Sequence, residues 1–263
     1  MILSEIWIYP IKSLGGIALT EASVEVRGLQ YDRRWMLVDA EWKFITQRKI
    51  HEMALIDVAL GKDGLEVRHR AFQEDVLFIP FEPINKESFT VKIWDDEVEA
   101  VTVSDEADRW FSRYLGQTIR LVKMPESTNR WVDSRYAKHQ EVVGFADDYP
   151  LLLISQASLD DLNSRLPVPV SMQRFRPNLI VNGTSPFAED GWTDLQIGSA
   201  TFKAVKPCSR CVLTTLDPAT GQAGAEPLKT LATYRKQNNK VMFGMNLLAQ
   251  PGRIAVGDPV EIQ

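Results

Sequence analysis

Short alternations of hydrophobic and polar residues recur along the chain and predict many β-strands. Residues 22–26 alternate hydrophobic and polar side chains before Gly28, whereas residues 35–38 form an uninterrupted hydrophobic run. A period of two is typical of a strand with one buried face, and a short hydrophobic run is typical of a strand buried on both faces. The same signals predict strands at residues 6–8, 53–60, 65–68, 179–182, 195–197, 201–205 and 212–216.

Turn residues between neighbouring hydrophobic segments predict hairpins in three places. These are residues 35–47 around a turn at 39–41, residues 89–103 around Asp95 and Asp96, and residues 253–262 around Gly257 and Asp258.

Three segments carry helical signals instead. Ser104 is a favourable N-cap, acidic residues fill the turn that follows it, and Gly116 supplies a stop after a stretch with helical spacing of apolar residues. A second helix is expected to start at Ser158. A third is expected to start at Pro227, because proline is favoured in the first turn, and to run through Tyr234.

Many short strands and few helices predict a mainly β protein with a few helices, of the α+β class. The chain has 263 residues, a length that fits two small domains or one large β-rich domain. Residues 118–146 are polar and weakly periodic, so we expect a domain boundary in this stretch.

The formal net charge of −5 argues against a protein that binds nucleic acid through phosphate contacts. No hydrophobic run is long enough to span a bilayer, and the first ten residues lack the basic start and long apolar stretch of a secretory signal. Two cysteines are too few for a secreted disulfide scaffold. We therefore expect a cytoplasmic protein that does not bind membranes.

The two cysteines, Cys208 and Cys211, form a Cys-x-x-Cys pair that has several interpretations. A thioredoxin-type redox pair normally opens a helix, whereas residues 212–216 predict a strand. Two small core residues are a further possibility. A structural zinc site needs four ligands. Only three histidines are present to complete one, and they do not stand at finger-like spacing: His51, His69 and His139.

Cationic neighbours favour a different role for this pair. Lys206 and Arg210 lie within a few residues of Cys211. Nearby cations favour the thiolate, which is the metal-binding form of cysteine and a ligand suited to soft or thiophilic metals.

Three other segments place basic side chains beside turns or strand ends. They contain Lys12 with Ser13, Arg33 with Arg34, and Arg174 with Arg176. Arginine binds phosphate through two parallel hydrogen bonds, and lysine acts as a point charge. These residues would hold an anionic ligand if the fold brings them together, and would be solvated surface charges if it does not.

The motifs taken together resemble the MOSC domain and its N-terminal β-barrel extension. Residues 206–218 are similar to the MOSC signature, residues 9–13 and 28–35 to the extension, and residues 175–179 to a further element. The resemblance includes the mitochondrial amidoxime-reducing component and a bacterial protein that acts on N-hydroxylated bases. It implies two linked β-barrel-like parts, an N-terminal domain at residues 1–117 and a MOSC barrel at residues 118–263, with the cofactor between them.

The resemblance also implies a molybdenum cofactor, molybdopterin. In this family the second cysteine of the signature binds the metal, which corresponds to Cys211. An acidic residue on the substrate side, with a catalytic role, corresponds to Asp147, which adjoins Asp148. The family's cofactor contacts correspond to Lys12, Ser13, Arg33, Arg176, Asn178, Ser209 and Arg210.

By this resemblance the chain is expected to be a molybdenum-dependent oxidoreductase that converts N–OH to N–H in small molecules. Two cysteines cannot hold an iron–sulfur cluster, which usually needs four. The electrons are therefore expected from a separate ferredoxin-like protein or flavoprotein reductase. One alternative is a cofactor carrier or sulfur-transfer module without its own turnover. Another is a β-barrel interaction protein whose site has lapsed.

Overall fold

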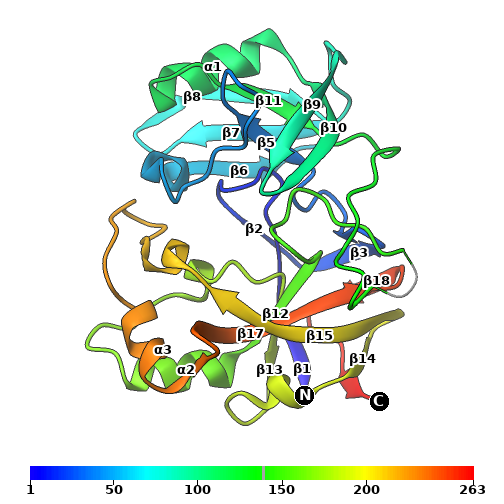
Figure 1. Ribbon diagram of the computed structural model, residues 1–263, viewed down its shortest axis with the longest axis vertical. Helices are drawn as coiled ribbons and strands as arrows, with labels where there is room; N and C mark the ends of the chain where they lie inside the picture. Colours follow the sequence, from blue (N-terminus) through cyan, green and yellow to red (C-terminus); the bar gives the residue numbers. More distant parts are fainter. Residues whose placement is uncertain (138–139) are drawn as a thin grey trace.

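β-Strands provide most of the regular structure in the computed structural model, which describes residues 1–137 and 140–263. Three α-helices accompany them in these two ranges: α1 (Asp105–Leu115), α2 (Gln156–Ser164) and α3 (Leu228–Tyr234). The predicted class, mainly β with a few helices, is confirmed. In Figure 1 the strands form an upper part beneath α1 and a lower part that carries both chain termini.

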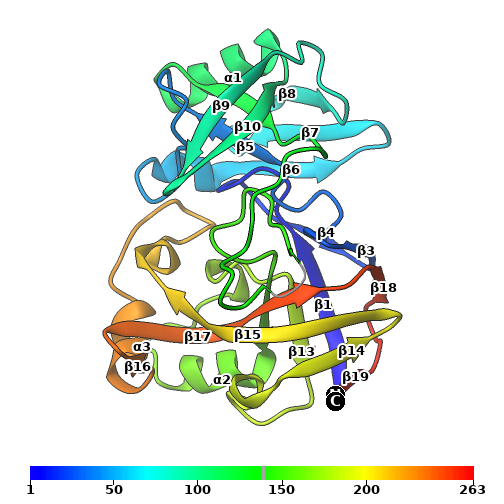
Figure 2. The same ribbon diagram turned by 45° about the vertical axis from the view of Figure 1, so that its right-hand side comes forward.

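The lower part is built on a nine-stranded sheet with the order β19-β14-β15-β17-β12-β13-β1-β2, to which β16 adds beside β17. Only the pair β12 and β13 is parallel. Figure 2 shows β15 and β17 as long strands that cross the whole lower part. The strands are β1 (Ile2–Ile8), β2 (Ile17–Leu19), β12 (Leu151–Ser155), β13 (Leu179–Asn182), β14 (Asp194–Ile197), β15 (Ala200–Arg210), β16 (Lys236–Gln237), β17 (Lys240–Ala249) and β19 (Val260–Ile262).

Both faces of this sheet are buried at its central strand β12, which explains the continuous hydrophobic run there. Successive side chains of a strand point to opposite faces. Leu151 and Leu153 therefore join one hydrophobic cluster, whereas Leu152 and Ile154 join another. Helices α2 and α3 cover the second cluster, to which they contribute Leu159, Leu162 and Leu231.

The upper part contains a four-stranded sheet with the order β5-β11-β10-β9 and a three-stranded sheet with the order β6-β7-β8. Helix α1 begins at the Ser104 cap, whose Oγ accepts a hydrogen bond from the backbone N–H of Ala107 at 3.2 Å, and ends at Gly116, as predicted. The strands are β5 (Trp35–Val38), β6 (Ile56–Leu60), β7 (Gly64–His69), β8 (Phe72–Pro80), β9 (Ser88–Ile93), β10 (Asp96–Thr102) and β11 (Arg120–Lys123).

A small third sheet holds residues from both ends of the chain. Its order is β18-β3-β4, with β3 (Glu21–Glu25), β4 (Gly28–Leu29) and β18 (Gly252–Ala255). The predicted hairpin at residues 253–262 is therefore wrong. Its strands exist, but β18 pairs with β3 while β19 pairs with β14. Backbone hydrogen bonds from Leu3 N–H to Asp258 C=O and from Gly257 N–H to Leu3 C=O hold the intervening turn against β1.

Four local predictions also fail. The strand predicted at residues 53–60 begins only at Ile56, because His51–Leu55 forms the 3₁₀ helix η1. Residues 212–216 are not a strand, because Val212–Thr215 forms the 3₁₀ turn η4, stabilised by hydrogen bonds from the Thr214 and Thr215 side chains to backbone carbonyls. Residues 44–47 form no return strand beyond a single bridge between Val38 and Phe44. Helix α2 starts before Ser158, since Ser155 is the residue whose side chain caps it.

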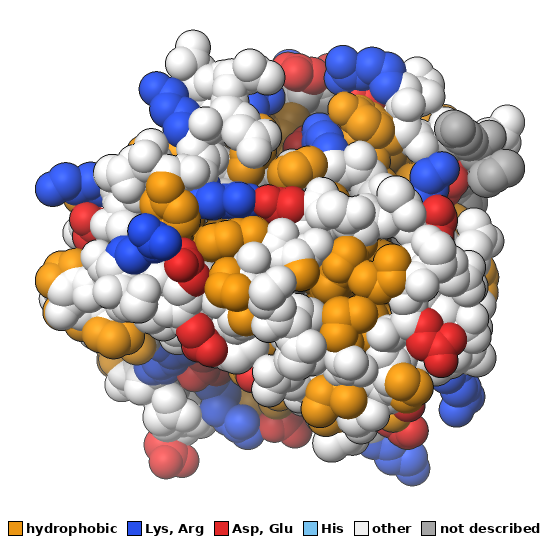
Figure 3. All heavy atoms as spheres, turned by 90° about the horizontal axis from the view of Figure 1, so that it is seen from below, with side chains coloured by type: hydrophobic (Ala, Val, Ile, Leu, Met, Phe, Trp, Pro, Cys, Tyr) orange, Lys and Arg blue, Asp and Glu red, His pale blue; other side chains and the backbone are white. Residues whose placement is uncertain are grey.

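The division of the chain at residue 117 stays a prediction. Along the chain, β11 follows residue 117 and pairs with β5 and β10, while β1 precedes it and pairs with β13. No helix in the described part of the chain is long and apolar enough to cross a membrane. Seen from below, positive and negative side chains are interspersed among hydrophobic ones (Figure 3).

Candidate functional site

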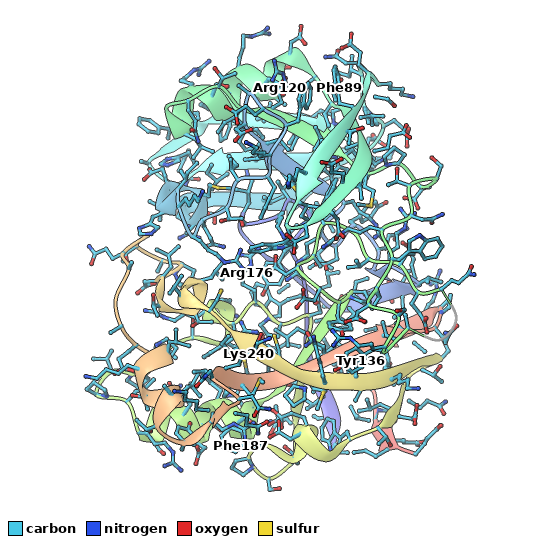
Figure 4. All side chains as sticks on the ribbon, in the orientation of Figure 1. Phe89, Arg120, Tyr136, Arg176, Phe187 and Lys240 are labelled. Carbon is cyan, nitrogen blue, oxygen red and sulfur yellow. The ribbon has the colours of Figure 1, made fainter. Side chains whose placement is uncertain are left out.

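A cavity of about 340 Å³ lies at the junction between the upper and lower parts. Figure 4 shows Arg176, one of its lining residues, at this junction. All nine residues predicted for the site line this cavity: Lys12, Ser13, Arg33, Asp147, Arg176, Asn178, Ser209, Arg210 and Cys211. The fold therefore gathers segments from the loop after β1, the turn before β5, the turn before β13 and the end of β15.

Asp147 is held between two cations in this cavity. Its Oδ1 lies 2.6 Å from the Nζ of Lys12, and its Oδ2 lies 2.7 Å from the Nη2 of Arg48. Lys12 also donates a hydrogen bond to the backbone carbonyl of Phe145 at 2.7 Å. Lys12 is almost fully buried, whereas the Asp147 side chain is 46% exposed. The carboxylate thus faces the open side of the cavity.

The protonation of this pair follows from burial and charge. Burial lowers the pKa of Lys12 from 10.5 to about 8, although the neighbouring Asp147 opposes this shift. Burial by itself raises the pKa of Asp147, but the charges of Lys12 and Arg48 and their hydrogen bonds hold it far below its usual range. Asp147 is therefore a carboxylate at neutral pH. Of the two residues, Lys12 is the one whose pKa lies nearer to neutrality.

A second cluster surrounds the ring of Tyr9, which is almost fully buried. The guanidinium carbons of Arg33 and Arg176 lie 4.4 and 4.1 Å from the ring centroid, within the range of cation–π attraction. Arg33 donates hydrogen bonds to Asp32 and to the Oδ1 of Asn178. Burial lowers the pKa of Arg176 to about 10, which still leaves it charged at neutral pH.

Asn178 is engaged by the protein itself. Its Oδ1 accepts hydrogen bonds from Arg33 and from the backbone N–H of Leu152, and its Nδ2 donates to the backbone carbonyl of Trp7. These bonds tie the ends of β1, β12 and β13 to Arg33. In this structure Asn178 therefore positions the arginine.

Three of the predicted residues adopt a left-handed backbone conformation. The φ angles of Ser13, Arg33 and Arg176 are +68°, +47° and +54°. Side chains other than glycine rarely adopt such angles, and residues that do so gather at functional sites. Three loops that converge on one cavity share this feature, which indicates that their backbones are held in place for binding.

The two cysteines differ in their surroundings. Cys211 is exposed, follows the last residue of β15 and receives a hydrogen bond from the Nε of Arg48 at 3.3 Å. Cys208 is half-buried, packs against the cluster under α2 and α3, and accepts a hydrogen bond from Arg210 at 3.1 Å. Cys211 is thus the more accessible sulfur in the cavity.

The structure also shows which basic residues lie elsewhere. Arg34 pairs with Glu25, and Arg174 pairs with Asp217. Lys206 lies over the rings of Tyr136 and Tyr149. None of the three lines the cavity. In the described ranges, His, Cys, Asp and Glu side chains do not gather in groups of three, and His139 lies outside the described residues.

Among the residues that sequence reasoning missed are Arg48 and Trp94, which line the cavity, and the supporting residue Arg130. Arg48 directly follows residues 44–47, for which the sequence predicts a return strand, and its neighbours carry no signal of a site. Arg130 donates hydrogen bonds to the carbonyls of Gly144, Ala146 and Asp147 and pairs with Asp96. Only Trp94 carried a signal, because a large apolar residue at a hairpin tip is unusual.

Comparison with known proteins establishes the family. The MOSC domain matches residues 140–261, and the MOSC N-terminal beta barrel domain matches residues 1–118. The chain is 35% identical to mitochondrial amidoxime-reducing component 1 of Mus musculus, over 98% of this chain and 81% of that protein. It belongs to the MOSC family. This membership confirms the resemblance found in the sequence motifs.

Two further relatives of this MOSC protein carry different names. Mitochondrial amidoxime reducing component 2 of Rattus norvegicus is 37% identical over 98% of this chain and 82% of that protein. Molybdenum cofactor sulfurase of Oryza sativa subsp. japonica is 35% identical over 93% of this chain, but the match covers only 32% of that longer protein. The MOSC fold of this chain is therefore shared by a reductase component and by part of a sulfurase.

The cavity fits molybdopterin in charge and donor chemistry. Five cationic residues line it against two carboxylates: Lys12, Arg33, Arg48, Arg176 and Arg210 against Asp147 and Asp148. The Nη2 of Arg176 and the Nε of Arg210 are buried and have no hydrogen-bond partner among the residues that the structure describes. A buried donor without a partner is unfavourable, so an anionic or acceptor-rich ligand would stabilise both. The Cys211 sulfur supplies a soft metal ligand beside them.

Proposed function

We propose that this protein is a molybdenum-cofactor-dependent reductase of N-hydroxylated compounds. The observation that carries the proposal is the convergence of Cys211, the cationic side chains and Asp147 on a single cavity. Further support comes from relatives named amidoxime-reducing components, which match 98% of the chain. The reaction would take two electrons and two protons, break the N–O bond, and release an N–H compound and water.

Cys211 would bind the metal, and the buried basic residues would hold the anionic part of the cofactor. Arg176 and Arg210 have free buried donors for this purpose, and Lys12 and Arg33 add positive charge. Ser13 and Ser209 would offer hydrogen bonds to the polar edge of the pterin, and Asn178, predicted as a cofactor contact, would support the site by holding Arg33. When bound, such a cofactor supplies two-electron oxygen-transfer chemistry that side chains lack.

Lys12 and Asp147 would divide the proton chemistry between them. Asp147, ionised and partly exposed, would accept a hydrogen bond from the N–H or O–H of a substrate. Lys12, with a pKa of about 8, holds a proton near neutral pH and touches the same carboxylate at 2.6 Å. Lys12 would therefore be the proton donor of the site, and Asp147, which stays ionised, would orient the substrate.

Electrons would come from a separate redox protein, such as a ferredoxin-like protein or a flavoprotein reductase. The exposed position of Cys211 would leave a metal bound there near the protein surface. Such a location suits exchange of electrons with a partner protein.

A second candidate is a carrier of the cofactor or a sulfur-transfer module. The exposed sulfur of Cys211 and the similarity to part of a molybdenum cofactor sulfurase favour it. In that role Cys211 would bind the cofactor or a sulfur atom without reducing a substrate.

The test is molybdenum and molybdopterin analysis of protein expressed in a cofactor-competent host, followed by benzamidoxime reduction with a reduced viologen dye. Wild type is expected to hold stoichiometric molybdenum and to form benzamidine. Cys211→Ala should lose the metal, whereas Cys208→Ala, a matched substitution in the same motif, should retain it. A loaded wild type that leaves benzamidoxime unchanged would favour the carrier. Cofactor missing from all three proteins would reject both candidates.

A further inference from the structure

Trp94 occupies a turn position that does not suit its side chain. The register of β9 and β10 pairs Ile93 with Asp96, so Trp94 and Asp95 form a two-residue hairpin loop. Trp94 has a φ of +54°. The turns that fit such hairpins need a positive φ at their first position, and glycine, asparagine or aspartate usually supply it. A tryptophan there is strained, so turn formation does not explain the residue.

Another hairpin of the same chain shows the usual solution. Gln237 pairs with Lys240, and the two loop residues between β16 and β17 are Asn238 and Asn239. Their φ angles are +46° and +61°. The chain therefore uses favoured residues in a comparable loop away from the cavity.

Core packing does not explain Trp94 either. Its side chain remains 41% exposed, although its ring contacts Phe44 with a centroid distance of 4.8 Å. The indole lines the same cavity as Cys211 and Asp147. Its Nε1–H donates a hydrogen bond to the Oδ1 of Asp147 at 3.2 Å. A flat apolar surface thus borders the open side of the cavity.

Arg48 contacts both the Trp94 indole and the Sγ of Cys211. Its guanidinium carbon lies 4.8 Å from the Trp94 ring centroid, its Nε donates to Cys211 and its Nη2 donates to Asp147. One planar cation therefore contacts the aromatic wall, the soft ligand and the carboxylate. A substrate that contacts Trp94 lies next to the groups assigned to the reaction.

The hairpin tip is fixed in this place. Arg130 is nearly buried, pairs with Asp96 at 2.7 Å, and donates to the backbone carbonyls of Ala146 and Asp147. The tip and the Asp147 loop are consequently tied to one side chain. Such pre-organisation is what a positioning surface requires.

We propose that Trp94 is the substrate platform of this enzyme, positioned by Arg48, and that it selects N-hydroxylated compounds with a planar aromatic substituent. The proposal rests on the proposed reductase function. Arg48 and Phe44 already contact the indole ring, so an aromatic substituent would pack against its exposed part, which would place the N–OH group toward Cys211 and the N–H group toward Asp147. Compounds with only a small alkyl substituent would gain nothing from the platform.

The experiment compares benzamidoxime with acetamidoxime, which share the reacting group and differ in the ring. Molybdenum-loaded wild type, Trp94→Gly, Trp94→Phe and Lys86→Gly are assayed with a reduced viologen dye. Trp94→Gly is expected to raise the KM for benzamidoxime about tenfold, the effect of losing one contact between aromatic rings. The KM for acetamidoxime should stay within about twofold, and Trp94→Phe should resemble wild type for both compounds.

Stability and metal content separate a platform from a structural role. Trp94→Gly relieves a strained turn, so its thermal midpoint should equal or exceed that of wild type, with equal molybdenum content. Lys86→Gly is the matched control, because Lys86 also has a positive φ of +57° but is not among the residues that line this cavity. It should leave both KM values unchanged. Equal losses for both amidoximes, or lost molybdenum in Trp94→Gly, would overturn the platform.

Binding tests the platform independently of turnover. Benzamidoxime is expected to quench the tryptophan fluorescence of wild type, and to quench Trp94→Phe markedly less. If wild type reduces neither amidoxime but this difference appears, the reductase function fails and the platform stands. If the difference does not appear, the platform fails whatever the activity. A Trp94→Gly defect seen only with a protein electron donor would identify the tip as a docking surface and reject the platform.

Discussion

The Nε of Arg48 lies 3.3 Å from the Sγ of Cys211, although 163 positions separate the two residues in the chain. Arg48 follows β5 in the upper part, and Cys211 directly follows the long strand β15 of the lower part. The proposed metal ligand therefore has a neighbour that the MOSC segment alone does not contain. The N-terminal extension completes the site.

This contact predicts that Arg48→Lys impairs the reductase, although the substitution keeps the positive charge. A lysine has a single ammonium group and cannot reach Cys211 and Asp147 with separate donors in one plane. We expect kcat/KM for benzamidoxime to fall about tenfold with molybdenum content unchanged. Arg174→Lys, which alters an arginine paired with Asp217 outside the cavity, is the control. An Arg48→Lys enzyme as fast as the control would contradict the assignment.

The buried amine of Lys12 predicts a pH-dependent stability. Below pH 8 Lys12 is protonated in the folded and unfolded states alike, and the folded state carries the full burial cost of the charge. Between about 8, its folded pKa, and 10.5, its ordinary pKa, the folded state releases a proton that the unfolded chain keeps. The free energy of unfolding should therefore rise with pH across this window.

Urea denaturation of wild type and Lys12→Met across that window measures the effect. Other titrating groups are common to both proteins, so the wild type should show the steeper rise. Parallel curves would mean that Lys12 keeps its ordinary pKa.

Arg130 is predicted to be a major stabilising residue. Its removal would leave buried carbonyls of Gly144 and Ala146 without their donor and Asp96 without its partner. Breaking such a buried network typically costs about 3 kcal/mol, so Arg130→Met should lower the urea midpoint clearly. Arg135→Met, which breaks an exposed pair with Asp133, should not move it. Similar midpoints for the two variants would refute this role.

Gly244 is predicted to tolerate no side chain. Its φ is +82°, and a Cβ there would lie 2.6 Å from the Cγ1 of Ile154 and 2.9 Å from the carbonyl oxygen of Leu153. Gly116 also has a positive φ, of +69°, but nothing lies within 4 Å of its added Cβ. Gly116→Ala should cost about 1 kcal/mol of backbone strain, and Gly244→Ala about 3 kcal/mol, because overpacking adds to the strain. Chemical denaturation measures both, and equal losses would exclude the clash.

Local signals predicted some elements because the signals lie inside the elements. Helix α1 carries its own cap at Ser104 and its own stop at Gly116, so its bounds were readable. Strand β17 was missed, since Gly244 interrupts its pattern and both of its faces are buried. The segment Val212–Thr215 has strand-forming residues, yet side-chain hydrogen bonds and its place after β15 make it a 3₁₀ turn.

The residues of the site also divide into those that sequence motifs predicted and those that they did not. Family motifs pointed to nine residues that the fold brings to one cavity. Arg48, Trp94 and Arg130 act through contacts with distant residues, so no local pattern marks Arg48 or Arg130. The turn position of Trp94 was the single readable sign, since its side chain conflicts with its backbone.

The pairing of β1 with β13 has a consequence for how the chain is made. β1 finds its neighbour β2 close by in the sequence, but Ile2 pairs with Asn182, so the other edge of β1 must wait until β13 has left the ribosome. Until then a hydrophobic strand with an open edge is exposed to other chains. Synthesis rate and chaperone supply should therefore govern the yield of this protein more strongly than its final stability does.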